Sequence, residues 1–101
     1  MLIYNTSYHL AEDLEKNFLI WMKEVHIPET KQEGTLKNPR LCKILSHQQP
    51  GDVSYTLQWE VEDSTTLHRW HIKHGEVAAS EINKIFNEKV MFFHTLMRVE
   101  E

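Results

Sequence analysis

The chain has 101 residues, of which 41% are hydrophobic and 26% are charged, and its formal net charge is −4. We expect one domain over residues 1–101, and this composition excludes disordered and fibrous proteins. The excess of acidic over basic residues argues against nucleic acid as a partner. No apolar run is long enough to span a membrane. The lack of a signal-peptide pattern predicts a cytoplasmic location.

The N-terminal third predicts a strand followed by a helix. Leu2–His9 alternates and is rich in β-branched and aromatic residues, as strands are. Acidic residues then precede an apolar stripe at helical spacing, which suits the helix dipole. Pro28 is expected to end this helix, because proline lacks the N–H group that the helical ladder needs. The stripe consists of Leu14, Phe18, Trp21, Met22 and Val25.

The middle of the chain predicts a hairpin. A polar connection over Glu29–Pro39 leads to a strand at Arg40–His47, and the clearest strand of the chain follows at Val53–Val61. A Pro-Gly turn signal between the two strands makes them antiparallel neighbours. Cys42, the lone cysteine, is expected as a small buried side chain of the first of these strands.

The C-terminal part predicts a second helical region and a last strand. Asp63 or Ser64 can cap the helix, Gly75 interrupts it, and a further helix runs through Asn87. Val90–Val99 is the last strand. The resulting order β-α-β-β-α-β is the ferredoxin-like pattern, an α+β domain with a four-stranded antiparallel sheet and helices on one face.

The last strand also predicts a partner. In this topology Val90–Val99 lies at a sheet edge, yet both of its faces are apolar. An edge of this kind invites aggregation unless something covers it. We therefore expect a homodimer in which the open sheet faces and the Val90–Val99 strands of two subunits pack against each other.

Three tryptophans indicate where a ligand would bind. Trp59 is expected on the helix-facing side of a central strand, with Trp21 and Trp70 on the helices above it. Their simplest role is to fill the core, and the alternative is that they wall a small apolar pocket with a few polar groups. The candidate ligand-binding residues are Asn5, Trp21, Trp59, Trp70 and His71, and the candidate catalytic acids or bases are His26 and His74.

The seven histidines do not form a recognisable metal motif. His68, His71 and His74 lie three residues apart, which spreads their rings over an arc of ~120° on a helix and suits three ligands of one ion poorly. The sequence also has no glycine-rich phosphate loop and no Cys-x-x-Cys pattern. We therefore expect neither a metal site nor a cofactor.

Nearly the whole chain resembles a small family from Bacteroides-type bacteria that is known only as a domain of unknown function. The resemblance implies the fold and a cytoplasmic bacterial setting, and it implies no activity. The residues that carry it are Met1–Asn5, Trp21-Met22, His26–Glu29, Gly34, Arg40-Leu41, Tyr55–Trp59 and Thr95-Leu96.

A second, superfamily-level resemblance is to dimeric α/β-barrel proteins. These include antibiotic-biosynthesis monooxygenases, ethyl-ether-degradation-type proteins, to which Lys23–Pro28 is similar, and haem-degrading monooxygenases. Trp59-Glu60 is similar to the monooxygenase pattern. Haem-degrading members use an asparagine on the first strand with a tryptophan and a histidine on the later helix. Asn5 and Trp70 match the first two, but the position of the histidine falls near Ser80.

Together these patterns predict a small-molecule-binding dimer with its pocket between the sheet and the helices, and with cofactor-independent chemistry as an extension of that role. The alternative is a non-enzymatic dimeric module that binds a protein partner or a regulatory ligand. A third interpretation is haem or metal binding. The sequence does not identify the ligand.

Overall fold

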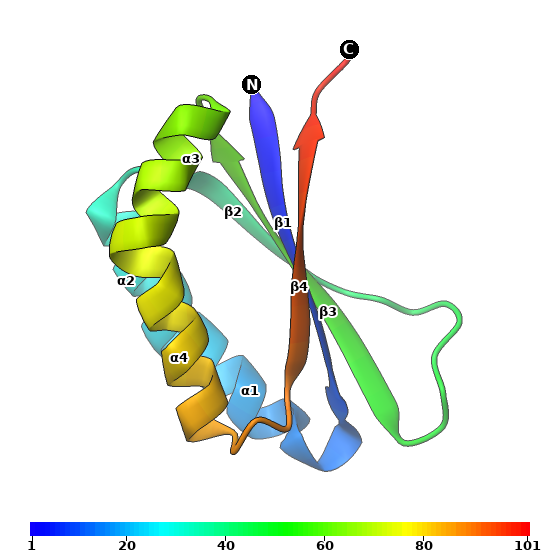
Figure 1. Cartoon of the computed structure of the whole chain (residues 1–101). Helices are drawn as coiled ribbons and strands as arrows, with labels where there is room; N and C mark the ends of the chain where they lie inside the picture. Colours follow the sequence, from blue (N-terminus) through cyan, green and yellow to red (C-terminus); the bar gives the residue numbers. More distant parts are fainter.

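The structure, a computed structural model, describes residues 1–101 and has the predicted ferredoxin-like architecture. One four-stranded antiparallel sheet has the strand order β2-β3-β1-β4. Two long helical segments lie side by side on one face of the sheet, and the other face is bare (Figure 1). The strands are β1 (Leu2–Ala11), β2 (Lys37–Lys43), β3 (Asp52–Val61) and β4 (Met91–Arg98).

The first helical segment is longer than the sequence predicts. A short 3₁₀ turn leads into α1 (Glu15–Trp21), and a π-helical turn over Met22–His26 connects α1 to α2 (Ile27–Glu33). The prediction that Pro28 ends the helix is therefore wrong. Its missing N–H falls in the first turn of α2, directly after the π-helical turn, where a donor is not required.

The second helical segment has the same construction. Asp63 caps α3 (Ser64–Trp70), because its carboxylate accepts a 2.7 Å hydrogen bond from the Thr66 backbone N–H. Gly75 does not end the helix, because a π-helical turn over His71–Gly75 carries the chain into α4 (Glu76–Ile85). A side chain at Gly75 would begin 2.7 Å from the His71 ring and 3.0 Å from the Trp70 ring, so a Cβ here would force at least the His71 ring to shift.

Two predictions for the hairpin are wrong in detail. The strand predicted at Arg40–His47 is β2, which starts at Lys37 and ends at Lys43. His47 has a positive φ of 58°, which is incompatible with a strand. Cys42 is exposed rather than buried, because it pairs with Thr56 on the face of the sheet that no helix covers.

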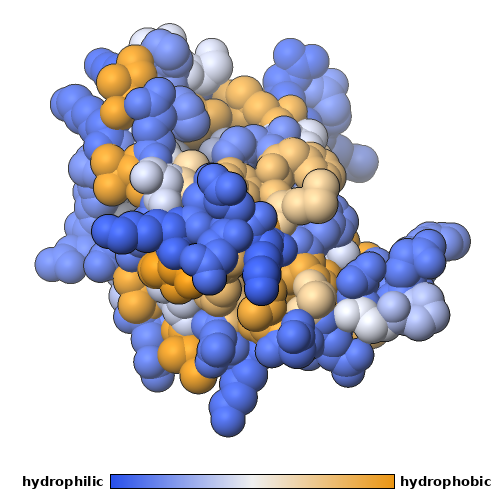
Figure 2. Space-filling model, turned by 60° about the horizontal axis from the view of Figure 1, so that its bottom comes forward, coloured by the Kyte–Doolittle hydropathy of each residue, from blue (hydrophilic) through white to orange (hydrophobic).

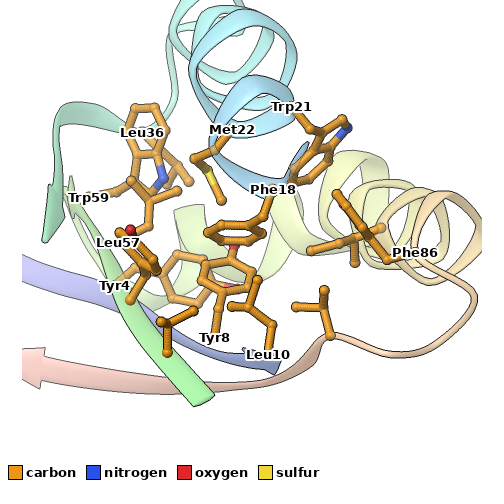
Figure 3. Packing of buried hydrophobic residues seen from close by; sticks show 14 of the residues in the cluster. Tyr4, Tyr8, Leu10, Phe18, Trp21, Met22, Leu36, Leu57, Trp59 and Phe86 are labelled. Atoms are coloured by element: carbon orange, nitrogen blue, oxygen red, sulfur yellow. The ribbon is translucent and has the colours of Figure 1, made fainter. Parts of the chain in front are cut away.

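The hydrophobic core fills the layer between the sheet and the helices. Alternate residues of β1 and β3 point into it and meet Phe18, Trp21 and Met22 from the first helical segment (Figure 3). This arrangement follows from the period of two along a strand, which sends every second side chain to the helical face. The strand residues involved are Tyr4, Tyr8, Leu10, Val53, Tyr55, Leu57, Trp59 and Val61.

The last strand exposes apolar side chains on the bare face of the sheet, whereas its helix-facing side also carries His94 and Arg98. One face of the molecule shows apolar side chains scattered among hydrophilic ones (Figure 2). Met91, Phe93 and Met97 are 70%, 54% and 38% exposed on the bare face of the sheet. Val90, just before the strand, is buried. This edge of the sheet therefore leaves a large apolar area in contact with water.

Candidate functional site

A cavity of about 30 Å³ lies between the helices and the sheet, in the aromatic part of the core. It is large enough for roughly two water molecules. All three tryptophans of the chain line it. The complete lining is Tyr4, Thr6 and Tyr8 from β1, Trp59 from β3, Phe92 and His94 from β4, and Trp21, His26, Trp70, Gly75, Ala78, Ala79 and Ile82 from the helical layer.

A wider groove of about 150 Å³ lies between the two helical segments. Three residues, His26, Trp70 and Ala78, line both the groove and the cavity, so the two spaces adjoin. Three carboxylates against a single lysine line the groove, which favours uncharged or cationic ligands over anionic ones. The remaining groove residues are Glu29, Thr30, Glu33, Lys73, His74, Val77 and Glu81.

The π-helical turns position aromatic rings at this junction. Ile27 donates its backbone N–H to the Met22 carbonyl, five residues back, so the turn contains one residue more than an α-helical turn. As a result His26 lies on the Trp21 ring, with ring centroids 4.9 Å apart and planes 13° apart. The second π-helical turn begins directly after Trp70, which contributes the other ring of the junction. Such turns are frequent at functional sites.

His26 is a neutral imidazole at physiological pH. Burial lowers its pKa from 6.5 to about 4, and the negative charge of Glu81 opposes this effect only in part. A neutral imidazole offers one donor and one acceptor nitrogen to a ligand. His26 therefore acts here as a polar, uncharged group at the point where groove and cavity meet.

The two helical tryptophans differ in their hydrogen bonding. The indole N–H of Trp21 donates to the carboxylate of Glu81 at 3.5 Å. Trp70 is only 6% exposed, and its buried indole N–H has no hydrogen-bond partner. A buried donor without a partner costs about 1–3 kcal/mol, so Trp70 is a place where a ligand acceptor would be stabilised.

His94 is a site residue that the sequence interpretation missed. Its Nδ1 lies 3.0 Å from the Tyr4 hydroxyl and 2.9 Å from the Thr6 hydroxyl. Partial burial and the neighbouring His71 lower the pKa of His94, which favours the neutral form of its ring. The last strand contained a signal for it, because His94 lies two residues after Phe92 and so shares the face that looks toward the helices.

The structure brings together four of the predicted site residues at the cavity: Trp21, His26, Trp59 and Trp70. His74 lies in the outer groove instead, with its Nε2 3.6 Å from the Glu33 carboxylate. His71 lines neither space, and its ring centroid is 6.4 Å from that of His94. These two histidines therefore flank the aromatic cavity rather than enter it.

The placement predicted for Asn5 is wrong. Asn5 pairs with Gln58 and Thr95 and alternates with Tyr4 and Thr6, so it points to the bare face of the sheet. It does not line the cavity, and the sheet separates it from Trp70. The asparagine–tryptophan combination that the haem-degrading resemblance requires is therefore not assembled.

No group of three or more His, Cys, Asp or Glu residues is arranged to hold a metal ion. None of the helices combines the length and the apolar character needed to cross a membrane.

The sheet order, the paired helical segments on one face and the aromatic cavity between them define a ferredoxin-like α+β protein. The chain belongs to the family described as domain of unknown function DUF4286, whose model matches residues 1–100. A search of curated proteins found no match.

Solved structures show the same fold. A candidate antibiotic biosynthesis monooxygenase from Deinococcus radiodurans superposes with a TM-score of 0.72 at 20% identity, covering 100% of this chain and 94% of that one. A dimeric ferredoxin-like protein from an uncultured marine organism gives 0.58 at 13% identity, covering 99% and 95%. The de novo designed protein Foldit4 gives 0.64 at 11% identity, covering 98% of both chains. Since a designed protein shares it, this fold alone does not specify an activity.

Proposed function

We propose that the protein binds a small, uncharged aromatic molecule that carries one hydrogen-bond acceptor. The observation that carries this proposal is the buried, unpartnered indole N–H of Trp70, on a ring that lines both the groove and the cavity. An acceptor on the ligand would satisfy this donor. The stacked Trp21–His26 pair supplies an aromatic wall for the ligand ring.

The size of the two spaces determines how such a ligand would sit. The inner cavity of about 30 Å³ is too small for an aromatic ring, since an engineered apolar cavity that binds benzene has ~150 Å³. The groove has that volume. The ligand would therefore occupy the groove and enter the cavity through the junction formed by His26, Trp70 and Ala78, with small shifts of these side chains.

A matched pair of probes tests this proposal. 2-Indanone carries a carbonyl acceptor, whereas indane has a similar shape and no acceptor. We expect the protein to bind 2-indanone about tenfold more tightly than indane, because one buried hydrogen bond contributes ~1.4 kcal/mol. Trp70→Phe should abolish this preference. The measurement is an NMR titration of each probe, and equal affinity of the unmodified protein for both probes would refute the role of Trp70.

Trp21→Phe is the matched control for this experiment. It makes the same change of ring at a cavity-lining tryptophan whose indole N–H already has Glu81 as its partner. In this variant the affinities for 2-indanone and for indane should change by the same factor, so that the preference for 2-indanone persists. Loss of the preference in this variant as well would assign it to the shape of the cavity.

We also propose that the protein forms a homodimer through the bare face of the sheet and the strand Val90–Val99. On this face β4 presents Met91, Phe93 and Met97 to solvent and carries no charged side chain. The Oδ1 atom of Asn5 is buried on the same face without a donor, which a second subunit would supply. The structural neighbour described as a dimeric ferredoxin-like protein supports this assembly.

Phe93→Lys tests the dimer interface. We expect the unmodified protein to sediment as a dimer at micromolar concentration, and Phe93→Lys to weaken the dimer at least tenfold. A two-fold interface contains each residue twice, so one substitution places two charges in an apolar contact. Leu45→Lys is the control, because Leu45 is 85% exposed in the β2–β3 loop. An unmodified protein that sediments as a monomer would refute the dimer.

A further inference from the structure

We propose that His94 is a proton-transfer residue that acts on a carbon atom next to the carbonyl group of a ligand bound at the cavity. This inference rests on the ligand site proposed above and names the chemistry of that site. It would make the protein a cofactor-independent catalyst of enolisation, acting on small aromatic ketones or aldehydes.

The first support is the way in which the His94 ring is held. Its Nδ1 lies within hydrogen-bond distance of two hydroxyl groups, those of Tyr4 and Thr6. A hydroxyl group can accept a hydrogen bond from a protonated Nδ1 or donate one to a bare Nδ1. Both neutral tautomers of His94 are therefore held in one ring orientation. Because Nδ1 is engaged, Nε2 is the nitrogen that remains free for a ligand.

The second support is the position of His94 among its neighbours. It lines the same cavity as Trp70, and the Tyr4 ring lies beside both: its centroid is 5.2 Å from His94 and 5.9 Å from Trp70. A base and an unpartnered hydrogen-bond donor thus stand at one small aromatic space. This is the pair of groups that enolisation requires, one for the proton and one for the carbonyl oxygen.

The proposed enolisation needs no reactant other than the ligand and His94. The bare Nε2 takes a proton from the carbon next to the carbonyl, and the electron pair of that C–H bond forms a C=C bond. The carbonyl π electrons move to oxygen, which accepts a hydrogen bond from the Trp70 indole N–H. The return step delivers a proton from Nε2 to the carbon. In D₂O the returning proton is a deuteron, so the step is visible as isotope exchange.

Few ionisable groups lie close enough to His94 to affect its protonation. Tyr4 faces it from β1 and His71 from the helical segment, while His26 lines the same cavity from the first segment. Burial together with His71 keeps the pKa of His94 below its ordinary value. The lowered pKa favours the neutral, basic form of the ring, which remains partly open to solvent.

Deuterium exchange of 2-indanone in D₂O tests this proposal. We expect the protein to accelerate the loss of the methylene signals in the ¹H NMR spectrum about 100-fold over the His94→Gln variant, as general acid–base catalysis typically does. His68→Gln is the matched control, because His68 is exposed on α3 away from the cavity, and its exchange rate should equal that of the unmodified protein.

The exchange experiment distinguishes a failure of proton transfer from a failure of ligand binding. Binding of 2-indanone without exchange above the buffer rate would overturn proton transfer and leave the ligand site standing. Equal exchange in His94→Gln would assign the reaction to another group and also overturn the proposal. Should His94→Gln not fold, the pH profile of the unmodified protein decides: exchange must fall as His94 becomes protonated, followed through its own ring signal. A flat profile contradicts the role of His94.

Discussion

Phe18→Ala is expected to lower the free energy of unfolding by about 3–5 kcal/mol, the usual cost of removing a buried aromatic ring. Phe18 is 0% exposed and lies at the centre of the core shown in Figure 3. Its ring centroid is 5.2 Å from Tyr8, 5.5 Å from Tyr55 and 6.3 Å from Phe86. The substitution therefore opens a cavity between the sheet and both helical segments.

Urea denaturation at one fixed protein concentration measures this effect, because dimer formation would make stability depend on concentration. Domains of this size have only about 5–15 kcal/mol of stability, so the loss is a large share of the total. Ile20→Ala in the same helix is the control, since Ile20 is 46% exposed, and it should cost less than about 1 kcal/mol. Similar losses in the two variants would contradict this description of the core.

We expect the free energy of unfolding to decrease as the pH is lowered from 6.5 to 4. The pKa of His26 is about 4 in the folded protein, against 6.5 for an ordinary histidine. Between these two values the unfolded chain binds a proton at His26 and the folded protein does not, so stability falls as the pH falls. The shift corresponds to about 2–3 kcal/mol, allowing for the part of the ring that reaches solvent.

His26→Phe identifies the source of this pH dependence. It retains a ring on Trp21 and removes the titrating group, so the fall in stability from pH 6.5 to pH 4.5 should become much shallower. The carboxylates of Glu15, Glu33 and Asp63, whose pKa values are lowered, respond below this window. His94 contributes in the same direction and leaves a smaller slope. An unchanged slope in urea denaturation curves would show that His26 is not buried in its neutral form.

The fold was predictable from the sequence because two periodicities were clear. Alternation along Val53–Val61 and the helical spacing from Leu14 to Val25 each identified the face that lies in the core. The π-helical turns were not predictable in this way. Each adds one residue to a helical turn, and neither Pro28 nor Gly75 distinguishes such a turn from a helix end in the sequence alone.

The candidate site was predictable only in its aromatic part. Trp21, Trp59 and Trp70 belong to apolar patterns, so their faces could be assigned. Asn5 was placed on the wrong face because a polar residue in a half-buried strand can serve either face, and a shift of one position reverses the assignment. His94 was missed because its partners Tyr4 and Thr6 lie about ninety residues away in the sequence and meet it only through the pairing of β1 and β4.

The proposed function requires the buried indole N–H of Trp70 to donate a hydrogen bond to a ligand acceptor. The most direct measurement is the NMR signal of this indole N–H in the protein saturated with 2-indanone and in the protein saturated with indane. A new hydrogen bond to the ketone should move the Trp70 signal downfield, while the Trp21 signal, already bonded to Glu81, moves little. A Trp70 signal that responds identically to 2-indanone and indane would contradict the proposed function.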